Sequence, residues 1–354
     1  MILANIWIQS LRNIANAHLM LHPRCNVIVG KNGSGKTSIL EAIYLLSRGQ
    51  SFKTRSIAPL IEFTKSKLSI SAKSCDEAAV LLEKDLKGNT FAYIDGKRCQ
   101  RISELTKLFP CQLFHHDLFQ IIDSSSQIRR KLLDWGLFYQ SSDYKEKISD
   151  FKKVLLQRNF VLKNNGSAME LRAWNKMFIE LSVQINEFRQ QYVNQLSEAF
   201  QQELSRFNPE FGCEIKYHRG WGAQLTLEES LIKHEELDRK FGYTRFGPQH
   251  ADLFILGEHG KGKLEWSRGQ QKLILILLKI AQVKLLEQNC LFLFDDLLAE
   301  LDEQKLHSLY ELFGKINGQF ILTVLDDAAK DTAIFKDSRW FYLKEGAIDK
   351  IIDY

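Results

Sequence analysis

The stretch Gly30–Thr37, which reads GKNGSGKT, decides the fold of this chain because it holds the full pattern G-x-x-x-x-G-K-[ST]. An apolar run, Val27–Val29, comes directly before it, and the helix-like run ILEAIYLLS follows at residues 39–47. The glycines let successive backbone N–H groups face one anion, and a following helix adds its positive N-terminal end. The sequence therefore predicts a strand, a phosphate-binding loop and a helix that together bind a nucleoside triphosphate.

Each position of this loop has a predicted role in holding the nucleotide. Lys36 is placed to reach the β- and γ-phosphates, and the Thr37 hydroxyl is placed to ligate Mg²⁺. The backbone of the remaining positions curls around the phosphates. The predicted contacts with ATP are Gly30, Lys31, Asn32, Gly33, Ser34, Gly35, Lys36 and Thr37.

The composition is ordinary for a globular chain. The 354 residues are 45% hydrophobic and 26% charged, and the formal charge of +5 permits a nucleic-acid partner without requiring one. The six cysteines stand singly, which favours reduced thiols over a disulfide or metal framework. There is no secretory signal pattern, and the most apolar run, residues 273–281, is too short to span a bilayer. We expect a cytoplasmic protein with no membrane anchor.

Strand-like patterns dominate the first third of the chain. We interpret residues 2–30 as two strands joined by a hairpin-like connection, the second of which delivers the phosphate loop. Alternating segments between residues 67 and 98 predict an antiparallel meander with turns at Gly88-Asn89 and Asp95-Gly96. The segment FPCQLFHHDL then predicts a strand that ends near His116.

From about Ser124 the period changes to that of helices, and a serine cap is predicted to open the first one. A helix around residues 148–155 is predicted to pack antiparallel to a longer one across the turn Asn164–Gly166. The longer helix carries a heptad-like apolar seam made of Leu171, Trp174, Phe178, Leu181, Ile185, Phe188 and Tyr192. This seam fits a core helix of a helical subdomain and a short coiled-coil arm equally well.

Two acids follow a second apolar run. Leu291–Asp296, LFLFDD, reads as a buried parallel strand, and the ligand sites of α/β sheets lie at the carboxyl ends of such strands. Asp295 is predicted to hold Mg²⁺, directly or through water, and Asp296 to orient or deprotonate the attacking water. The segment is therefore interpreted as the Walker B strand that accompanies the phosphate loop.

A third segment places a helix start one helix before these acids. Ser267–Gln271 opens a strongly apolar helix, and a serine hydroxyl with free N–H groups at a helix N-terminus binds an anion. The order of the segments favours the signature loop of ATP-binding-cassette ATPases, with Ser267, Gly269 and Gln270 as nucleotide contacts. Leu297–Gln304 matches the D-loop position after Walker B.

Together these segments resemble the RecF family, bacterial recombination-repair ATPases related to the heads of SMC proteins. The resemblance covers essentially the full chain, and it is carried by LRN at 11–13, residues 30–56, SQIRRKLLD at 126–134, FGPQHADL at 246–253, SRGQQK at 267–272, residues 291–302 and QFILT at 319–323. It implies an α/β fold, an ABC-type (SMC-like) P-loop ATPase head with an inserted helical lobe. We interpret residues 1–123 and 241–354 as ATPase lobe I, and 124–240 as helical lobe II with a short coiled-coil-like arm.

The resemblance also implies a nucleotide geometry and partners. ATP would be sandwiched between the phosphate loop of one subunit and Ser267–Gln270 of the other, with Arg12 and Asn13 approaching the nucleotide. The resulting ATP-dependent homodimer would engage DNA at single-strand/double-strand junctions and aid RecA loading at gaps, with RecR and RecO as partners. We interpret Arg268 and Gln249-His250 as departures from the family's usual residues, and Arg268 is predicted near the γ-phosphate of a partner's ATP.

The site predicts slow ATP hydrolysis that acts as a timer. Asp296 is one methylene shorter than the glutamate of fast cassettes, and Thr323 stands where transporter cassettes carry a switch histidine. Two alternatives stay open: a nucleotide-binding subunit of a transporter, and a non-hydrolysing SMC-like clamp. Candidate cations for DNA contact are Lys53, Arg55, Lys65, Lys67, Lys97, Arg98, Arg101, Arg129, Arg130 and Lys131.

Overall fold

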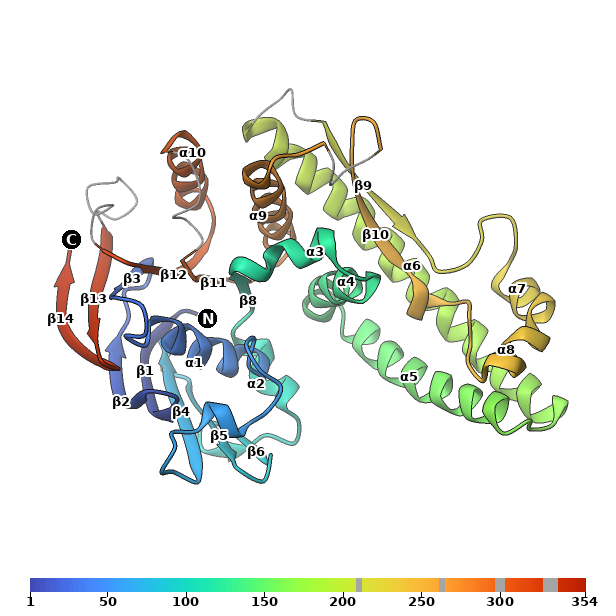
Figure 1. Cartoon of the computed structure of the whole chain (residues 1–354), viewed down its shortest axis with the longest axis horizontal. Coiled ribbons are helices and arrows are strands. Elements are labelled where there is room, and N and C mark those ends of the chain that lie inside the picture. The colour runs from blue at the N-terminus through green and yellow to red at the C-terminus, as the bar shows by residue number, and fades with distance from the viewer. Residues whose placement is uncertain (208–211, 261–264, 297–302, 327–336) are drawn as a thin grey trace. The chain divides into compact units, whose positions relative to one another are not determined.

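The computed structural model of the chain describes residues 1–207, 212–260, 265–296, 303–326 and 337–354 (Figure 1). The chain forms two compact units. Unit 1 joins the two ends of the chain, residues 1–117 and 287–354, and unit 2 comprises residues 118–286. No helix among the described residues combines the length and the apolar character needed to cross a membrane, and none of the six cysteines forms a disulfide.

Unit 1 contains a mostly parallel sheet in the order β14-β13-β3-β12-β11-β8. Its strands are β3 (Cys25–Val29), β8 (Cys111–Phe114), β11 (Cys290–Phe294), β12 (Gly318–Val324), β13 (Ser338–Lys344) and β14 (Ala347–Asp353). The strand predicted within residues 291–296 is confirmed as β11, which is buried throughout and parallel to its neighbours β12 and β8. Because β12 is also parallel to β3, the carboxyl ends of β3 and β11 emerge at the same edge of the sheet.

The second sheet of unit 1 is antiparallel, in the order β2-β1-β4-β5-β6-β7. Its strands are β1 (Leu3–Leu11), β2 (Ile14–Met20), β4 (Lys67–Ser74), β5 (Ala79–Asp85), β6 (Thr90–Ile94) and β7 (Lys97–Arg98). The predicted meander is confirmed, and both predicted turns carry left-handed residues, with φ of 87° at Gly88, 48° at Asp95 and 76° at Gly96. Strand β8 ends at Phe114, two residues before the predicted end.

The prediction of two strands in residues 2–30 is wrong, since the structure has three. β1 and β2 form an antiparallel hairpin, and a separate strand, β3, delivers the phosphate loop. The burial patterns give the physical reason: β2 alternates buried and exposed residues, as in a sheet with one solvated face, whereas every residue of β3 is buried. The two strands therefore belong to different sheets.

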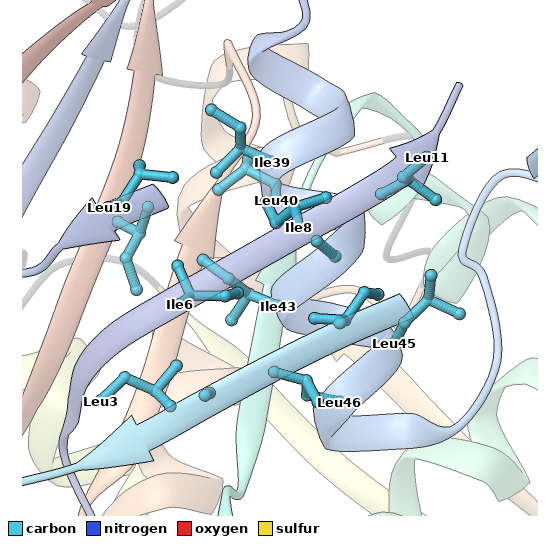
Figure 2. Packing of buried hydrophobic residues seen from close by; sticks show 14 of the residues in the cluster. Leu3, Ile6, Ile8, Leu11, Leu19, Ile39, Leu40, Ile43, Leu45 and Leu46 are labelled. Atoms are coloured by element: carbon cyan, nitrogen blue, oxygen red, sulfur yellow. The ribbon is translucent and has the colours of Figure 1, made fainter. Parts of the chain in front are cut away.

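Helix α1 (Lys36–Arg48) lies between the two sheets of unit 1 and is buried along most of its length. Figure 2 shows Ile39, Leu40 and Ile43 of this helix against Ile6 and Ile8 of β1. Leu293, Ile321 and Phe341 of the parallel sheet complete the same hydrophobic cluster. The helix that starts at the phosphate loop is thus fixed by apolar contacts on two sides. The other helices of unit 1 are α2 (Ile102–Leu108), α10 (Glu303–Gly314) and the 3-10 helix Ala58–Leu60.

Unit 2 is built mainly from helices. They are α3 (Gln120–Asp123), α4 (Ser126–Gln140), α5 (Ser142–Lys163), α6 (Ala168–Phe207), α7 (Leu227–Lys233), α8 (Glu235–Phe241) and α9 (Arg268–Lys284). Two antiparallel strands, β9 (Cys213–His218) and β10 (Asp252–Gly257), pair with each other, and a 3-10 helix spans Pro248–His250. Another 3-10 helix, His116–Phe119, contains the boundary between the two units. Ser125 stands at the N-cap of α4, but its side chain makes no capping hydrogen bond, unlike the predicted serine cap.

The long predicted helix is confirmed as α6, and its first half pairs with α5 across the turn at Asn164–Gly166 (Figure 1). The seam is buried at Leu171, Phe178, Ile185 and Tyr192. Trp174, Leu181 and Phe188 are half-buried. Because α6 also packs on α9 and β9, the structure favours the core-helix alternative over an isolated arm.

The compact units divide the chain at places that differ from the predicted lobe boundaries. Residues 241–286 were predicted to join lobe I, whereas they belong to unit 2. The reason is non-local pairing: β10 forms a sheet with β9, and α9 packs on α6. The first boundary falls after Asp117 rather than after Asp123.

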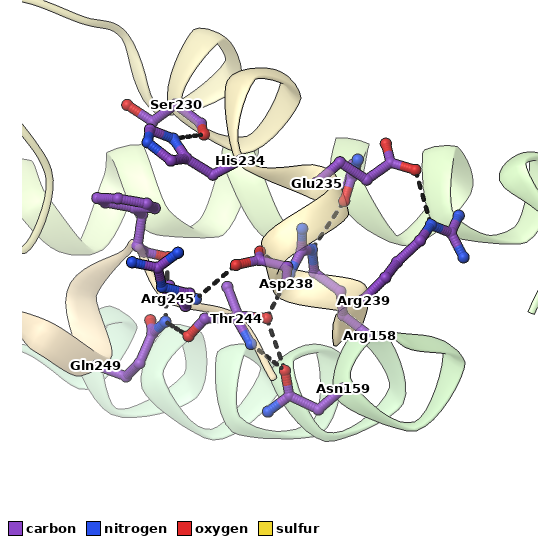
Figure 3. A network of polar contacts seen from close by, with 12 residues as sticks. Arg158, Asn159, Ser230, His234, Glu235, Asp238, Arg239, Thr244, Arg245 and Gln249 are labelled. Carbon is purple, nitrogen blue, oxygen red and sulfur yellow. Dashed lines mark hydrogen bonds and ion pairs between the residues drawn. The ribbon is translucent and has the colours of Figure 1, made fainter. Parts of the chain in front are cut away.

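Arg158 joins three helices of unit 2 through a buried ion pair and a hydrogen bond, and Figure 3 shows the ion pair. Arg158 of α5 donates to Asp238 of α8 at 3.2 Å and to Asn175 of α6 at 2.8 Å, and the side chains of both ions are 0% exposed. Burial raises the pKa of Asp238 although Arg158 lowers it, and burial likewise lowers the pKa of Arg158. Desolvation therefore opposes each charge, and each ion depends on its partner.

We expect Asp238→Ala to destabilise the chain by about 3–5 kcal/mol, because it leaves the Arg158 guanidinium buried without its counter-ion. The measurement is the free energy of unfolding in urea. Asp150→Ala is a matched control on α5, since Asp150 forms an exposed pair with Lys153 at 2.8 Å and should cost less than about 1 kcal/mol. Equal effects of the two substitutions would contradict the assignment of Arg158–Asp238 as a mutually dependent pair.

Candidate functional site

The loop between β3 and α1 has the tight curl that the glycine pattern predicts. The Ser34 N–H donates to the Lys31 carbonyl at 3.1 Å, and φ is 81° at Gly33 and 108° at Gly35, a region that favours glycine. A Cβ at Gly30 would lie 2.4 Å from Ser34 Oγ, so a side chain at this position collides with the loop itself. Lys31 and Asn32 are exposed at the outside of the curl.

Lys36 lies with its side chain inside this loop. Lys36 is only 4% exposed. Its Nζ donates to the Gly30 carbonyl at 2.6 Å and approaches the Lys31 carbonyl at 3.5 Å. An ammonium group carries three donors, so the same group can serve phosphate oxygens at the mouth of the loop. Its position agrees with the role predicted from the pattern.

The structure brings together the two predicted magnesium ligands. Thr37 Oγ1, at the start of α1, donates to Asp295 Oδ1, at the end of β11, at 2.9 Å. These residues are 258 positions apart in the chain and meet because β3 and β11 flank the same strand. A hydroxyl and a carboxylate oxygen in contact are ligands of the kind that Mg²⁺ takes beside phosphate oxygens.

Asp296 stands next to this pair in a left-handed conformation, with φ of 49°. Its N–H donates to Thr323 Oγ1 of β12 at 2.9 Å. Partial desolvation by the surrounding protein raises the pKa of the Asp296 carboxyl, and the ammonium groups of Lys36 and Lys53 lower it. The neighbouring Asp295 carboxylate also raises this pKa, and on balance the pKa of Asp296 lies above its ordinary value.

Arg12 and Asn13 form the turn between β1 and β2, and they contact the phosphate loop and helix α1 directly. The Arg12 guanidinium holds the buried carboxylate of Glu41 on α1 through Nε and Nη2, with Nη2 3.0 Å from Oε1. Asn13 Nδ2 donates to the Gly33 carbonyl at 3.1 Å, and Ser38 Oγ donates to Asn13 Oδ1 at 3.0 Å. Both residues thus brace the loop and the helix that follows it.

Sequence reasoning missed several residues that support the loop. Glu41 is a single acid within an apolar run, and that isolation was the available signal. It also accepts a hydrogen bond from Ser51 Oγ. The Gly346 N–H donates to the Ser34 carbonyl at 2.8 Å, and a Cβ at Gly346 would lie 2.1 Å from the Asn13 carbonyl oxygen. Only a Glu345-Gly346 turn signal marked this contact in the sequence.

The predicted signature residues begin helix α9 in unit 2. Ser267 and Gln270 form a capping box: the Ser267 N–H donates to Gln270 Oε1 at 2.8 Å, and the Gln270 N–H donates to Ser267 Oγ at 3.3 Å. Arg268 is largely exposed, pairs with Asp123 at 3.2 Å and lies 5.0 Å from the centre of the Phe119 ring. The predicted D-loop falls mostly on residues 297–302, which lie outside the described residues.

The cations proposed for DNA contact fall into two groups. Arg129 and Arg130 make contacts within the chain. Arg129 forms a bidentate ion pair with Asp252 at 2.7 and 2.9 Å, and Arg130 donates to the Ala251 carbonyl at 2.7 Å. Both guanidinium groups are thus partly buried and hydrogen-bonded within unit 2, and their contact with DNA stays a prediction. The exposed members are Lys53, Arg55, Lys65, Lys67, Lys97, Arg98, Arg101 and Lys131. Within this set, Lys67 pairs with Glu83 at 2.7 Å.

The residues of the loop fit the nucleoside triphosphate and Mg²⁺ that the pattern implies. Ser34 Oγ is buried and has no hydrogen-bond partner among the described residues. A Cβ at Gly33 would meet no atom within 4 Å, so the backbone there is open to an approaching phosphate. Thr37 and Asp295 supply two oxygen ligands at the same place. The donor set is thus of the kind that phosphate and a hard cation need.

Comparison with known proteins assigns the class. The family model described as "RecF/RecN/SMC N terminal domain" matches residues 2–338, and the chain therefore is a P-loop ATPase head of the ABC type related to SMC proteins. It is 33% identical over 360 residues to "DNA replication and repair protein RecF" of Vibrio cholerae, covering 98% of this chain and 99% of that one. The protein of the same name from Marinomonas sp. is 35% identical over 356 residues, covering 98% and 97%. The chain belongs to the RecF family.

A solved structure supports the same fold. The structure of "the recombination mediator protein RecF-ATP in RecFOR pathway" superposes with a TM-score of 0.87 at 24% sequence identity. The match covers 99% of this chain and 98% of that one. The predicted fold class is confirmed, and membership of the RecF family excludes the transporter subunit as an alternative.

We expect Gly30→Ala to abolish the thermal stabilisation of the chain by ATP and Mg²⁺. The added Cβ would lie 2.4 Å from Ser34 Oγ and 2.9 Å from the Leu343 carbonyl oxygen, so the loop must shift. The unsubstituted chain should gain about 2.7 kcal/mol at a nucleotide concentration of roughly 100 times Kd. Gly222→Ala is the control, because its Cβ would meet no atom within 4 Å. A full stabilisation retained by Gly30→Ala would contradict the predicted role of the loop.

Proposed function

We propose that the chain is an ATP-dependent DNA-binding protein of recombination repair, acting in the cytoplasm. The observation that carries the proposal is the contact between Thr37 and Asp295, which joins the phosphate loop to the Walker B strand. The proposal is supported by relatives that are named DNA replication and repair proteins and by a relative whose solved structure is described as RecF-ATP.

The proposed nucleotide site is shared between two copies of the chain. ATP binds to Gly30–Thr37 of one copy, with Thr37 and Asp295 holding Mg²⁺, and Arg12 and Asn13 lie beside the loop. Ser267, Gly269 and Gln270 of the second copy close on the phosphates, because the start of α9 offers N–H groups and a positive helix end. ATP then stabilises the closed dimer by its higher affinity for that state.

Hydrolysis reopens the dimer and acts as a timer. Asp296 orients or deprotonates the attacking water, and Lys36 neutralises charge on the phosphates. The short side chain of Asp296 holds water less firmly than a glutamate would, so turnover is slow. Mg²⁺, when bound, supplies charge neutralisation between the phosphate oxygens.

The closed dimer is proposed to engage DNA at junctions between single and double strands. The exposed cations of unit 1 supply contacts with phosphates, and the bound dimer aids RecA loading at gaps. RecR and RecO are the proposed protein partners by family resemblance.

We expect ATP and Mg²⁺ to convert the purified chain from monomer to dimer in light scattering. Lys36→Ala should stay monomeric, since it removes the ammonium group inside the phosphate loop. Asp296→Asn should form the dimer and keep it, because the variant retains the nucleotide contacts and loses the water-orienting carboxylate. A monomer under all conditions would contradict the sandwich, and a wild-type hydrolysis rate in Asp296→Asn would contradict the role of that residue.

Binding to a junction DNA should fall steeply with salt, because phosphate contacts release counter-ions. Removal of one such contact, by Lys65→Ala, should reduce the slope of log K against log salt by about one. The measurement is fluorescence anisotropy of labelled DNA in the presence of ATP. Lys153→Ala, an exposed cation of α5 outside the candidate set, should leave the slope unchanged. A flat salt dependence of the unsubstituted chain would argue against a phosphate-contact surface.

A further inference from the structure

Thr323 is the second-to-last residue of β12, the strand that separates the phosphate loop from the two acids, and it is 3% exposed. Its hydroxyl oxygen lies at the centre of a group of polar atoms from the last residue of β11 and the two acids that follow this strand. It accepts the Asp296 N–H at 2.9 Å, and it lies 3.3 Å from the Phe294 carbonyl, 3.2 Å from Asp295 Oδ1 and 3.3 Å from Asp296 Oδ1. All four contacts are with three consecutive residues at the end of one neighbouring strand.

The hydroxyl has one proton for three acceptors. One lone pair of Oγ1 receives the Asp296 N–H, and the single O–H can serve the Phe294 carbonyl or either carboxylate at a given moment. Asp295 Oδ1 already accepts the Thr37 hydroxyl at 2.9 Å. The Thr323 proton is therefore shared between Asp295, the predicted magnesium ligand, and Asp296, the residue proposed to orient the attacking water.

The backbone of Asp296 needs such support. A φ of 49° costs free energy for a non-glycine residue, although Asp tolerates this region better than most residues, so contacts that fix the backbone there stabilise it. The hydrogen bond from the Asp296 N–H to Thr323 Oγ1 fixes the backbone amide of Asp296. The Thr323 hydroxyl also lies within hydrogen-bond distance of the Asp296 carboxylate. A valine at this position has the same shape and fills the same space in β12, but it can make neither of these two hydrogen bonds.

We propose that Thr323 is a positioning residue for hydrolysis, which holds Asp296 in the left-handed conformation that aims its carboxylate at the attacking water. This inference rests on the proposed function, since it concerns the hydrolytic step of the same site. Thr323 acts through Asp296 and need not touch the nucleotide. The threonine thereby has a role of its own at the position where transporter cassettes carry a switch histidine.

The test compares Thr323→Val, which removes the hydroxyl, with Thr323→Ser, which keeps it. Thr323→Val should slow single-turnover ATP hydrolysis on the order of tenfold, as expected for the loss of one positioning hydrogen bond. The Kd for ATP and the ATP-dependent dimer should change by less than about twofold, because no nucleotide contact is removed. Thr323→Ser should hydrolyse ATP at close to the wild-type rate.

Thr106→Val is the matched control, since Thr106 is a buried threonine of α2 whose hydroxyl donates to the Ser103 carbonyl at 3.2 Å. It should lose a hydroxyl without changing the hydrolysis rate. A wild-type rate in Thr323→Val overturns the proposal, as does a loss of ATP binding that matches the loss of rate. If Thr323→Val fails to fold, Thr323→Cys takes its place, with the same slow hydrolysis expected and the same outcomes against it.

A second measurement separates this inference from the proposed function. Hydrogen exchange at the Asp296 amide should speed up by roughly tenfold or more in Thr323→Val, because its acceptor is gone. This readout needs no turnover. A wild-type chain that binds no ATP would overturn the proposed function while leaving the amide result intact. An Asp296 amide that exchanges equally in the wild type and in Thr323→Val would overturn the positioning role, whatever the ATPase activity.

Discussion

The site depends on one constraint of the sheet, which is that β12 lies between β3 and β11. Parallel strands are spaced about 4.8 Å apart, so the strand that delivers the phosphate loop and the strand that delivers the acids stand roughly 10 Å apart. The loop spans this separation and ends at Thr37, whose hydroxyl meets Asp295 at 2.9 Å. Because all three strands are parallel, every group concerned emerges at one edge. The middle strand contributes Thr323 at the same edge, so it takes part in the site as well as spacing it.

The apolar surroundings of α1 explain why a buried carboxylate occurs beside the loop. A helix packed between two sheets has no solvated face along most of its length, so Glu41 must be paired or it would lose its charge. Arg12 and Ser51 satisfy it, and they come from segments on either side of α1 in the chain. The buried acid therefore joins the β1–β2 turn and the segment after α1 to the helix that follows the phosphate loop. We infer that its role is geometric, since a buried ion pair by itself adds little to stability.

The sequence predicts most of the site, because its parts have local signals. A glycine pattern requires a curl, an apolar run followed by two acids indicates a buried strand, and Ser267 with Gln270 forms a capping box three residues apart. The errors concern non-local pairing. No periodicity reveals that β10 pairs with β9, and residues 241–286, which we interpret as part of lobe I, belong to compact unit 2 in the structure. Arg129 shows the same limit, since only the structure reveals that Asp252, 123 residues away, holds it.

The capping box at the start of α9 determines which backbone amides of the first turn lack a partner within the helix. Ser267 and Gln270 use each other's amide hydrogens, which leaves the amides of Arg268 and Gly269 as the donors of the first turn without an intrahelical acceptor. A glycine at position 269 allows close approach to those amides, whereas the Arg268 side chain is held to one side by Asp123 and Phe119. In the proposed dimer, these two amides are the donors that a phosphate of the other copy's nucleotide would meet. An exposed pair such as Arg268–Asp123 contributes little free energy, so the predicted approach of Arg268 to a partner's γ-phosphate would require only a weak contact to break.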